Sequence, residues 1–452
     1  MKYKIKLIII IVLQILTIGC DQFLDVKPNK NLVVPATLDD CQALMDNKVL
    51  IEKGLGSGEV WSDDYFLTDA NYLSLAENFR TMYRWDRSFI YEGAFNDWKT
   101  TYDQIYLCNL VLETLGKIDA KENEKMFYND VLGQALFHRA HYYFQALILW
   151  GAAYHPNNAK SELGISLRSN LDGDEKTVRA SLEECYTYIL NDLIRALDVL
   201  PETSISPVRP TRYAVASLLG RVYLSMGAFD KARQYIEIAL DHNASLMNFN
   251  SMNSNLANSF KQFNVEVIFE SRGVYPAMLT AKRANVAREL IDLYDQKDLR
   301  LKLYYAYISA GQYTFKGSYE GNATFFNGIS TNENYLNMAE CLARAGTLDL
   351  AIDHIINLWK NRMSDFNVDQ ARSDLKAMNQ HKLIAMILLE RRKELPFRGL
   401  RWMDLKRLAA LGEISTMSRS VDGMVYELKT DSRHMLLPIP ENIVALTGIK
   451  QN

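Results

Sequence analysis

Two stretches of this chain repeat one spacing of small and large apolar residues, and this repeat restricts the folds open to it. Small residues on a helix let an antiparallel neighbour approach closely, while larger ones fill the seam between the two. Gly227 permits a tight turn between the helices of the first stretch. The first set is Ala216, Leu219, Gly220, Tyr223, Ala232, Ile236 and Ala239, and the second is Tyr335, Met338, Ala339, Leu342, Gly346, Ala351, Ile355 and Leu358.

Further helix pairs extend the pattern in both directions. Residues 136–150 and 182–200 read as a third pair, separated by an insertion much longer than an ordinary turn. A fourth begins near Trp98. Capping boxes, in which a serine and a glutamate three residues later cap each other's backbone, are expected at Ser181–Glu184 and Ser330–Glu333. The fold class is therefore mostly α, an interrupted tetratricopeptide-like helical repeat scaffold over about 98–245 and 330–410.

The segments between these repeats have a different character. Residues 54–97 and 246–329 are rich in aromatic residues and lack a clean helical period. Residues 265–269 read as a strand, and the glycine-rich 54–58 reads as a flexible loop without the lysine that a phosphate-binding loop needs. We expect an inserted loop-rich, aromatic-rich lobe with short strands, and we expect it to carry the ligand site.

The first twenty residues predict where the protein resides. Lysines precede a short apolar run that ends in Gly19-Cys20, the layout of a bacterial lipoprotein signal. We expect residues 1–19 to be a signal peptide, Cys20 to carry acyl chains such as palmitate, and 20–36 to be a tether. Several acyl chains anchor a protein stably without spanning the membrane. Residues 37–452 then form a single domain.

Charge and residue spacing argue against several classes of function. The formal net charge of −3 does not suit a nucleic-acid partner. Cys41, Cys108, Cys185 and Cys341 lie far apart without metal-type spacing, and helical patterns around three of them predict small buried residues. We therefore expect no metal and no cofactor.

Three motifs resemble catalytic or metal sites but favour a structural interpretation. Asp63-Asp64 would point to opposite faces of an extended segment and so would not form a paired acid and base. His138 and His141 lack the acidic partner of a zinc site. The charges of 390–407 fall at helical spacings typical of surface ion pairs. None of these predicts an enzyme.

Four places in the chain carry one combination of motifs: the segment Cys20–Pro28; Ser62-Asp63-Asp64 followed by Trp98, Tyr102, Ile105 and Asn109; Glu333 to Arg362; and Glu390–Arg407 followed by Leu436-Leu437-Pro438-Ile439-Pro440. This combination resembles the SusD/RagB family of outer-membrane nutrient-binding lipoproteins. It implies a lipid-anchored protein that faces outward from the outer membrane. Such a protein binds a glycan, or in some members a peptide, and delivers it to a TonB-dependent barrel transporter without catalysis.

Aromatic side chains are the residues we expect to bind the ligand. The apolar faces of sugar rings lie flat on tryptophan or tyrosine, while rim polar groups bond the hydroxyls. The resemblance implies that aromatics in 60–97 face the ligand, and a second group in 304–313 is expected to face them. Substituting Trp61 or Trp85 by alanine should then weaken binding without unfolding the protein. The candidates are Trp61, Asp64, Tyr65, Tyr83, Trp85, Tyr304, Tyr305 and Tyr313.

Two other functions remain open from the sequence. A concave helical-repeat surface also suits a lipoprotein scaffold for outer-membrane assembly that binds peptides. A lipid-anchored glycosidase would use Asp63 or Asp64. The C-terminal Arg401-Trp402 and Leu437-Pro438-Ile439-Pro440 segments favour nutrient binding over the assembly scaffold.

Overall fold

The computed structural model describes residues 35–88, 90–91, 95–309, 311–414, 416–430 and 433–452. The predicted signal peptide, Cys20 and nearly all of the tether lie outside these residues. No helix in the described ranges has the length and apolar character needed to cross a membrane.

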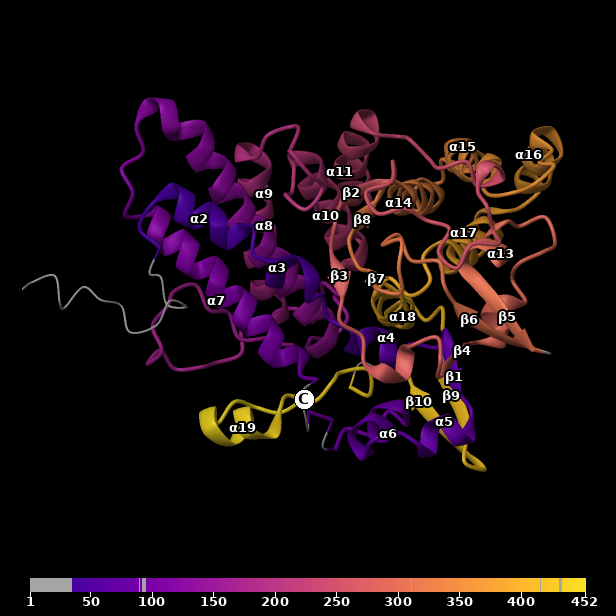
Figure 1. The fold of residues 1–452 in the computed structure, drawn as a ribbon, viewed down its shortest axis with the longest axis horizontal. Helices are drawn as coiled ribbons and strands as arrows, with labels where there is room; N and C mark the ends of the chain where they lie inside the picture. Colours follow the sequence, from indigo (N-terminus) through magenta and orange to yellow (C-terminus); the bar gives the residue numbers. More distant parts are fainter. Residues whose placement is uncertain (1–34, 89, 92–94, 310, 415, 431–432) are drawn as a thin grey trace, which may run out of the picture.

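A continuous stack of helices forms the scaffold, as the repeats predict. Each helix packs on the next from α7 to α11, α11 then packs on α14, and α14 on α15 and α17 (Figure 1). This confirms the mostly helical fold class. The helices are α7 (Asp97–Leu115), α8 (Lys125–Trp150), α9 (Leu182–Val199), α10 (Arg212–Ser225), α11 (Phe229–His242), α14 (Thr331–Arg344), α15 (Leu348–Lys360), α16 (Val368–Lys376) and α17 (Gln380–Glu394).

The turns of the two repeated pairs share one device. Gly227 between α10 and α11 has φ +71°, and Gly346 between α14 and α15 has φ +80°, a left-handed conformation that favours glycine. Gly220 lies against the partner helix so closely that a Cβ there would be 2.5 Å from Ile236 Cγ1. The small residues of the repeat therefore act as predicted.

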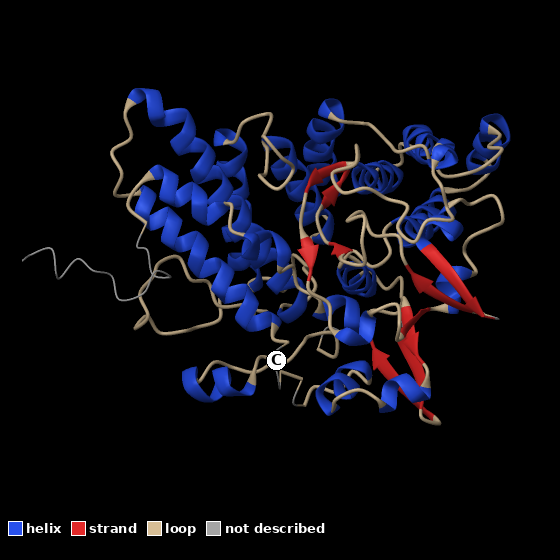
Figure 2. Ribbon diagram, in the orientation of Figure 1, coloured by secondary structure: helices blue, strands red, loops and turns tan. Residues whose placement is uncertain are grey.

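The lobe consists of short elements gathered in the half of the molecule away from α7–α9 (Figure 2). Among the described residues, the strands of the lobe form antiparallel pairs: β1 (Tyr65–Leu67) with β4 (Ala284–Val286), β2 (Val267–Phe269) with β8 (Ile329–Ser330), β3 (Arg272–Gly273) with β7 (Phe325–Phe326), and β5 (Tyr305–Ser309) with β6 (Gln312–Phe315). A C-terminal hairpin pairs β9 (Thr416–Val421) with β10 (Met424–Lys429) in the same way. The strand expected at 265–269 is β2.

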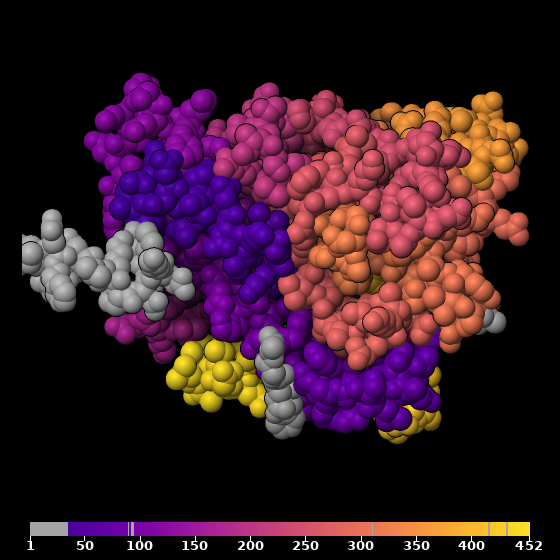
Figure 3. All heavy atoms as spheres, viewed as in Figure 1, coloured from indigo at the N-terminus to yellow at the C-terminus, as the bar shows by residue number. Residues whose placement is uncertain are grey.

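Short helices complete the lobe and both ends of the described chain. Around the lobe they are α4 (Ser57–Trp61), α5 (Asp69–Leu73), α6 (Glu77–Tyr83), α12 (Arg288–Ile291) and α13 (Arg300–Tyr304). Near the ends lie α2 (Leu38–Met45), α3 (Lys48–Glu52), α18 (Arg401–Ala410) and α19 (Glu441–Thr447). In Figure 3 the yellow C-terminal residues lie beside the purple first segment of the lobe, residues 54–97, called the early lobe below.

Two local predictions were wrong. Residues 54–58 are not a flexible loop: Ser57 to Trp61 form the buried helix α4, and a Cβ on Gly58 would lie 3.2 Å from Trp402 Cβ. The capping box expected at Ser330 does not form either, although the one at Ser181 does. Ser330 belongs to β8 and its hydroxyl donates to Asn332, while Glu333 binds Arg221 at 2.6 Å.

The four described cysteines are buried in α2, α7, α9 and α14, and all are free thiols. The expectation of small buried residues, made for three of them, thus holds for all four.

Gly328 gives a direct test of the packing between β2 and β8. A Cβ at this position would lie 2.1 Å from the main-chain oxygen of Phe269, and backbone cannot easily move away. We expect Gly328→Ala to lower the free energy of unfolding by about 1–3 kcal/mol, measured by urea denaturation. Gly173→Ala is the matched control, since nothing lies within 4 Å of its Cβ position. Equal stability of the two variants would contradict this account.

Candidate functional site

The predicted ligand-binding residues lie mostly in the core. Trp61, Tyr65, Tyr83, Trp85 and Asp64 are buried around α4, β1 and α6. Tyr304 and Tyr305, at the junction of α13 and β5, are also buried. Of the eight, only Tyr313 in β6 keeps a partly exposed side chain. The other seven have no free face on which a sugar ring could stack in this conformation.

The buried aromatics of the first group pack around one arginine. The guanidinium of Arg419, from β9, lies 4.4–4.9 Å from the ring centroids of Tyr65, Tyr83 and Trp85. It also donates hydrogen bonds to the main-chain oxygens of Tyr83, Val60 and Ser62. This arrangement fixes the β9–β10 hairpin onto the early lobe, so we assign these rings to packing.

Trp61 belongs to the same core. Its ring meets that of Trp402 edge-on, with centroids 5.7 Å apart. The indole N–H of Trp85 donates to the main-chain oxygen of Trp61 at 2.9 Å. Trp61 therefore joins the lobe to α18.

Asp63 and Asp64 are paired with arginines, and they are not separated as predicted. Asp63 binds Arg401 at 2.7 and 2.8 Å, Asp64 binds Arg392 at 2.7 Å, and Arg392 also lies 3.3 Å from Asp63. Although burial opposes it, Arg401 and Arg392 hold the pKa of Asp63 below its ordinary value. Burial raises the pKa of Asp64, against the effect of Arg392. The pair fastens the lobe to α17 and α18.

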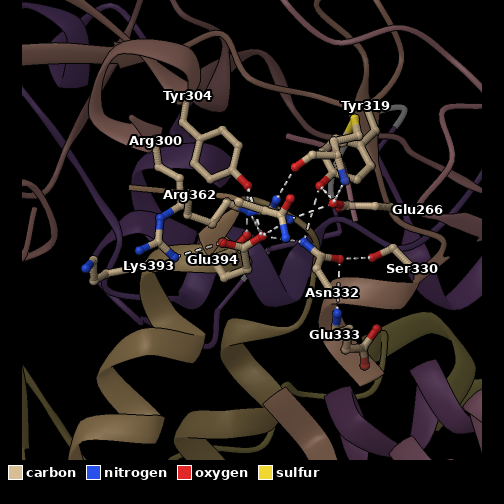
Figure 4. Close-up of polar contacts among 12 residues, drawn as sticks. Glu266, Arg300, Tyr304, Tyr319, Ser330, Asn332, Glu333, Arg362, Lys393 and Glu394 are labelled. Carbon is tan, nitrogen blue, oxygen red and sulfur yellow. Dashed lines mark hydrogen bonds and ion pairs between the residues drawn. The ribbon is translucent and has the colours of Figure 1, made fainter. Parts of the chain in front are cut away.

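The charged C-terminal motif is structural, but it is not a set of surface pairs. Figure 4 shows Glu394 between Arg300, Arg362 and Asn332. These contacts measure 2.7–2.8 Å, and the side chains of Glu394 and both arginines are fully buried. Arg362 also bonds Glu266 at 2.7 Å. Burial opposes ionisation, yet Arg362 and Arg300 keep the pKa of Glu394 below its ordinary value.

His138 and His141 pack as core residues of α8. Both contact the ring of Phe269, and burial lowers the pKa of His138 to about 4, which leaves it neutral. Across the part of the chain that the structure describes, no three His, Cys, Asp or Glu side chains cluster in a way that would hold a metal ion.

A cavity of about 450 Å³ opens where the segment after α6 meets the C-terminal residues. Its walls combine apolar surface with a guanidinium, amides and a carboxylate. It is lined by Arg87, Ser88, Ile90, Tyr91, Pro438, Ile439, Glu441, Asn442, Gln451 and Asn452.

Part of this lining is fixed and part is free. The Tyr91 hydroxyl donates to the main-chain oxygen of Pro438 at 2.7 Å, and Arg87 donates to that of Asn452 at 2.9 Å. Burial lowers the pKa of Arg87. Glu441 and Asn442 are exposed at the start of α19, and neither side chain is bonded to any described residue. Free polar groups beside a held tyrosine ring suit a ligand with both hydroxyls and apolar faces.

Sequence reasoning missed this cavity. Its two walls lie some 350 residues apart, as the bond between Tyr91 and Pro438 shows, and no spacing rule connects them. The available signals were the aromatic content of the segment around Tyr91 and the Leu437-Pro438-Ile439-Pro440 segment, which the sequence did not connect.

Solved structures share this fold over nearly the whole chain. A putative sugar binding protein from Bacteroides vulgatus superposes with a TM-score of 0.75 at 22% identity, covering 93% of this chain and 99% of that one. A SusD superfamily protein from Bacteroides thetaiotaomicron gives a TM-score of 0.72 at 20% identity, covering 92% and 99%. The fold is thus that of the SusD-like helical proteins.

Sequence comparison gives the family. Residues 22–224 match a model described as starch-binding associating with outer membrane, and 331–452 match the model of the SusD family. SusD-like protein P2 of Formosa agariphila is 25% identical over 405 residues, which cover 76% of each chain. This chain belongs to the SusD/RagB family.

Proposed function

We propose that this protein is a cell-surface, glycan-binding lipoprotein that captures a nutrient and delivers it to a TonB-dependent outer-membrane transporter. The observation that carries the proposal is family membership at both ends of a chain with the SusD-like fold. The Gly19-Cys20 lipoprotein signal supports the anchor. Because Asp63 and Asp64 are held by arginines, we propose capture without hydrolysis.

We place the glycan in the cavity beside α19. Hydroxyl groups would bond Asn442, Glu441 and Arg87, and an apolar sugar face would lie against Tyr91 and Pro438. Asn442 carries both donors and an acceptor, which matches a hydroxyl in either role.

Asn442→Ala tests this site. Losing one or two hydrogen bonds to the ligand should weaken binding about five- to tenfold, measured by calorimetry against a panel of oligosaccharides and peptides. Asn357→Ala, on an exposed position of α15, is the matched control and should bind normally. Unchanged affinity in Asn442→Ala would remove the cavity from the proposal.

Tyr313 stays a candidate at a second surface. Its ring lies 5.4 Å from that of Tyr307, which is 63% exposed on the β5–β6 hairpin. If Tyr313→Ala weakens binding and Asn442→Ala does not, the glycan binds at the hairpin and not in the cavity.

Recovery of the lipidated protein from native outer membranes tests the partner. A stoichiometric TonB-dependent barrel in the eluate would support delivery to a transporter. Recovery with assembly factors instead would favour the scaffold function. Binding of peptides in place of sugars in the calorimetry panel would show that the ligand is a peptide.

A further inference from the structure

Two glutamates far from the cavity are buried against each other. Glu270 lies between β2 and β3, Glu320 follows β6, and both side chains are 0% exposed. Their carboxyl groups share two neighbours, the amide of Gln262 and the guanidinium of Arg272. Gln262 Nε2 lies 3.2 Å from Glu270 Oε1 and 3.4 Å from Glu320 Oε2. The pair thus joins three segments of the lobe.

Among the described residues, Arg272 is the only cation that contacts the pair. It also binds a third carboxylate, that of Glu52. Arg272 Nε lies 2.6 Å from Glu320 and 3.6 Å from Glu270, while its Nη1 binds Glu52 of α3 at 2.6 Å. The shorter contact marks Glu320 as the closer partner of Arg272. A second buried negative charge beside it would lack compensation.

The two carboxyl groups can accept one more hydrogen bond than the described residues supply. Glu270 Oε2 and Glu320 Oε1 are buried, and no N–H or O–H of the described residues reaches either oxygen. A proton on one carboxyl supplies that donor to the other, as in other close carboxyl pairs.

We propose that Glu270 carries a proton that it shares with Glu320 in the folded protein, and that this bond is an alkali-sensitive joint within the lobe, beside the contact of Arg272 with Glu52 of α3. The joint is independent of the proposed function. The joint depends on one proton. When Glu270 is neutral, Arg272 has to pair only with Glu320 and Glu52.

The expected pH dependence has a definite sign. Burial and the neighbouring Glu320 raise the pKa of Glu270 to about 9 from its ordinary 4.5. Between these values the folded state holds a proton that the unfolded state has released, so stability falls as pH rises. On the α8 side, His138 and His141 contact Phe269 beside the pair, and burial lowers the pKa of both.

Glu270→Gln tests the joint, because its amide N–H replaces the proton at every pH. Urea denaturation should show the wild type losing up to about tenfold in folding equilibrium constant per pH unit relative to this variant, between about pH 5 and pH 9. If the free energies of unfolding of the wild type and Glu270→Gln change in parallel with pH over this range, the proposal is overturned.

Glu320→Gln is the paired variant with the opposite effect. It removes the carboxyl group that lies closest to Arg272, so we expect lower stability throughout the range. If instead Glu320→Gln is the stabilised variant at alkaline pH, the proton has been placed on the wrong residue. Infrared spectroscopy of the wild type should also show a protonated carboxyl at neutral pH that Glu270→Gln lacks. If the spectrum of Glu270→Gln keeps the same band, the proposal is overturned, even if Glu320→Gln fails to fold.

Discussion

Glu394→Ala should lower the free energy of unfolding by about 3–5 kcal/mol, a large part of the roughly 5–15 kcal/mol that an ordinary protein has. The substitution leaves Arg300 and Arg362 buried with one acceptor fewer each, and it removes the closer of the two acceptors of the Asn332 amide. The cost comes mainly from removing one charged partner of each buried arginine, while Arg362 keeps Glu266 and Arg300 keeps Asp298. Soluble yield and urea denaturation measure it.

Asp103→Ala is the control for this prediction. It breaks an ion pair with Lys99 in which both side chains are exposed, and such pairs contribute at most about 1 kcal/mol. A Glu394→Ala protein as stable as Asp103→Ala would show that the buried cluster of Figure 4 does not hold the lobe to the scaffold.

Trp61→Ala should destabilise the protein by about 3–5 kcal/mol, the cost of removing a fully buried tryptophan. This reverses the expectation from sequence, which placed Trp61 at a ligand surface. The indole packs edge-on against Trp402, and its removal leaves a cavity between α4 and α18. Thermal and urea denaturation, measured without any ligand, report the loss.

Tyr307→Ala is the matched aromatic control, since this ring is 63% exposed on the β5–β6 hairpin. We expect a change within about 0.5 kcal/mol. Normal stability in Trp61→Ala together with weaker ligand binding would restore the ligand-facing interpretation.

The helical scaffold was predictable because its signals are local. A glycine that must adopt a positive φ, as Gly227 and Gly346 do, and a small residue beside a partner helix recur at fixed spacing along the chain. The burial of Cys41 and the strand at Val267 follow from similarly short patterns.

The site residues were less predictable because burial depends on distant segments. Nothing near Trp61 in the sequence indicates that Trp402 covers it, and nothing near Tyr83 reveals Arg419. Aromatic residues suit both a core and a sugar surface, so composition alone could not separate the two. Asp404 and Arg407 form the ion pair that their i,i+3 spacing predicts, with a contact of 2.8 Å. The pair is buried, whereas the sequence predicted a surface pair.

The bonds from Arg419 to the carbonyl oxygens of Val60 and Ser62 have a consequence for the order of assembly. These partners are separated by 359 and 357 residues. Closing so large a loop is entropically costly and slows folding. During folding the first lobe segment (54–97) must therefore wait, with its aromatic residues unprotected, until residues near the C-terminal end of the chain reach it. A protein truncated before β9 would retain its repeat helices but would lack the residue that completes the first lobe segment.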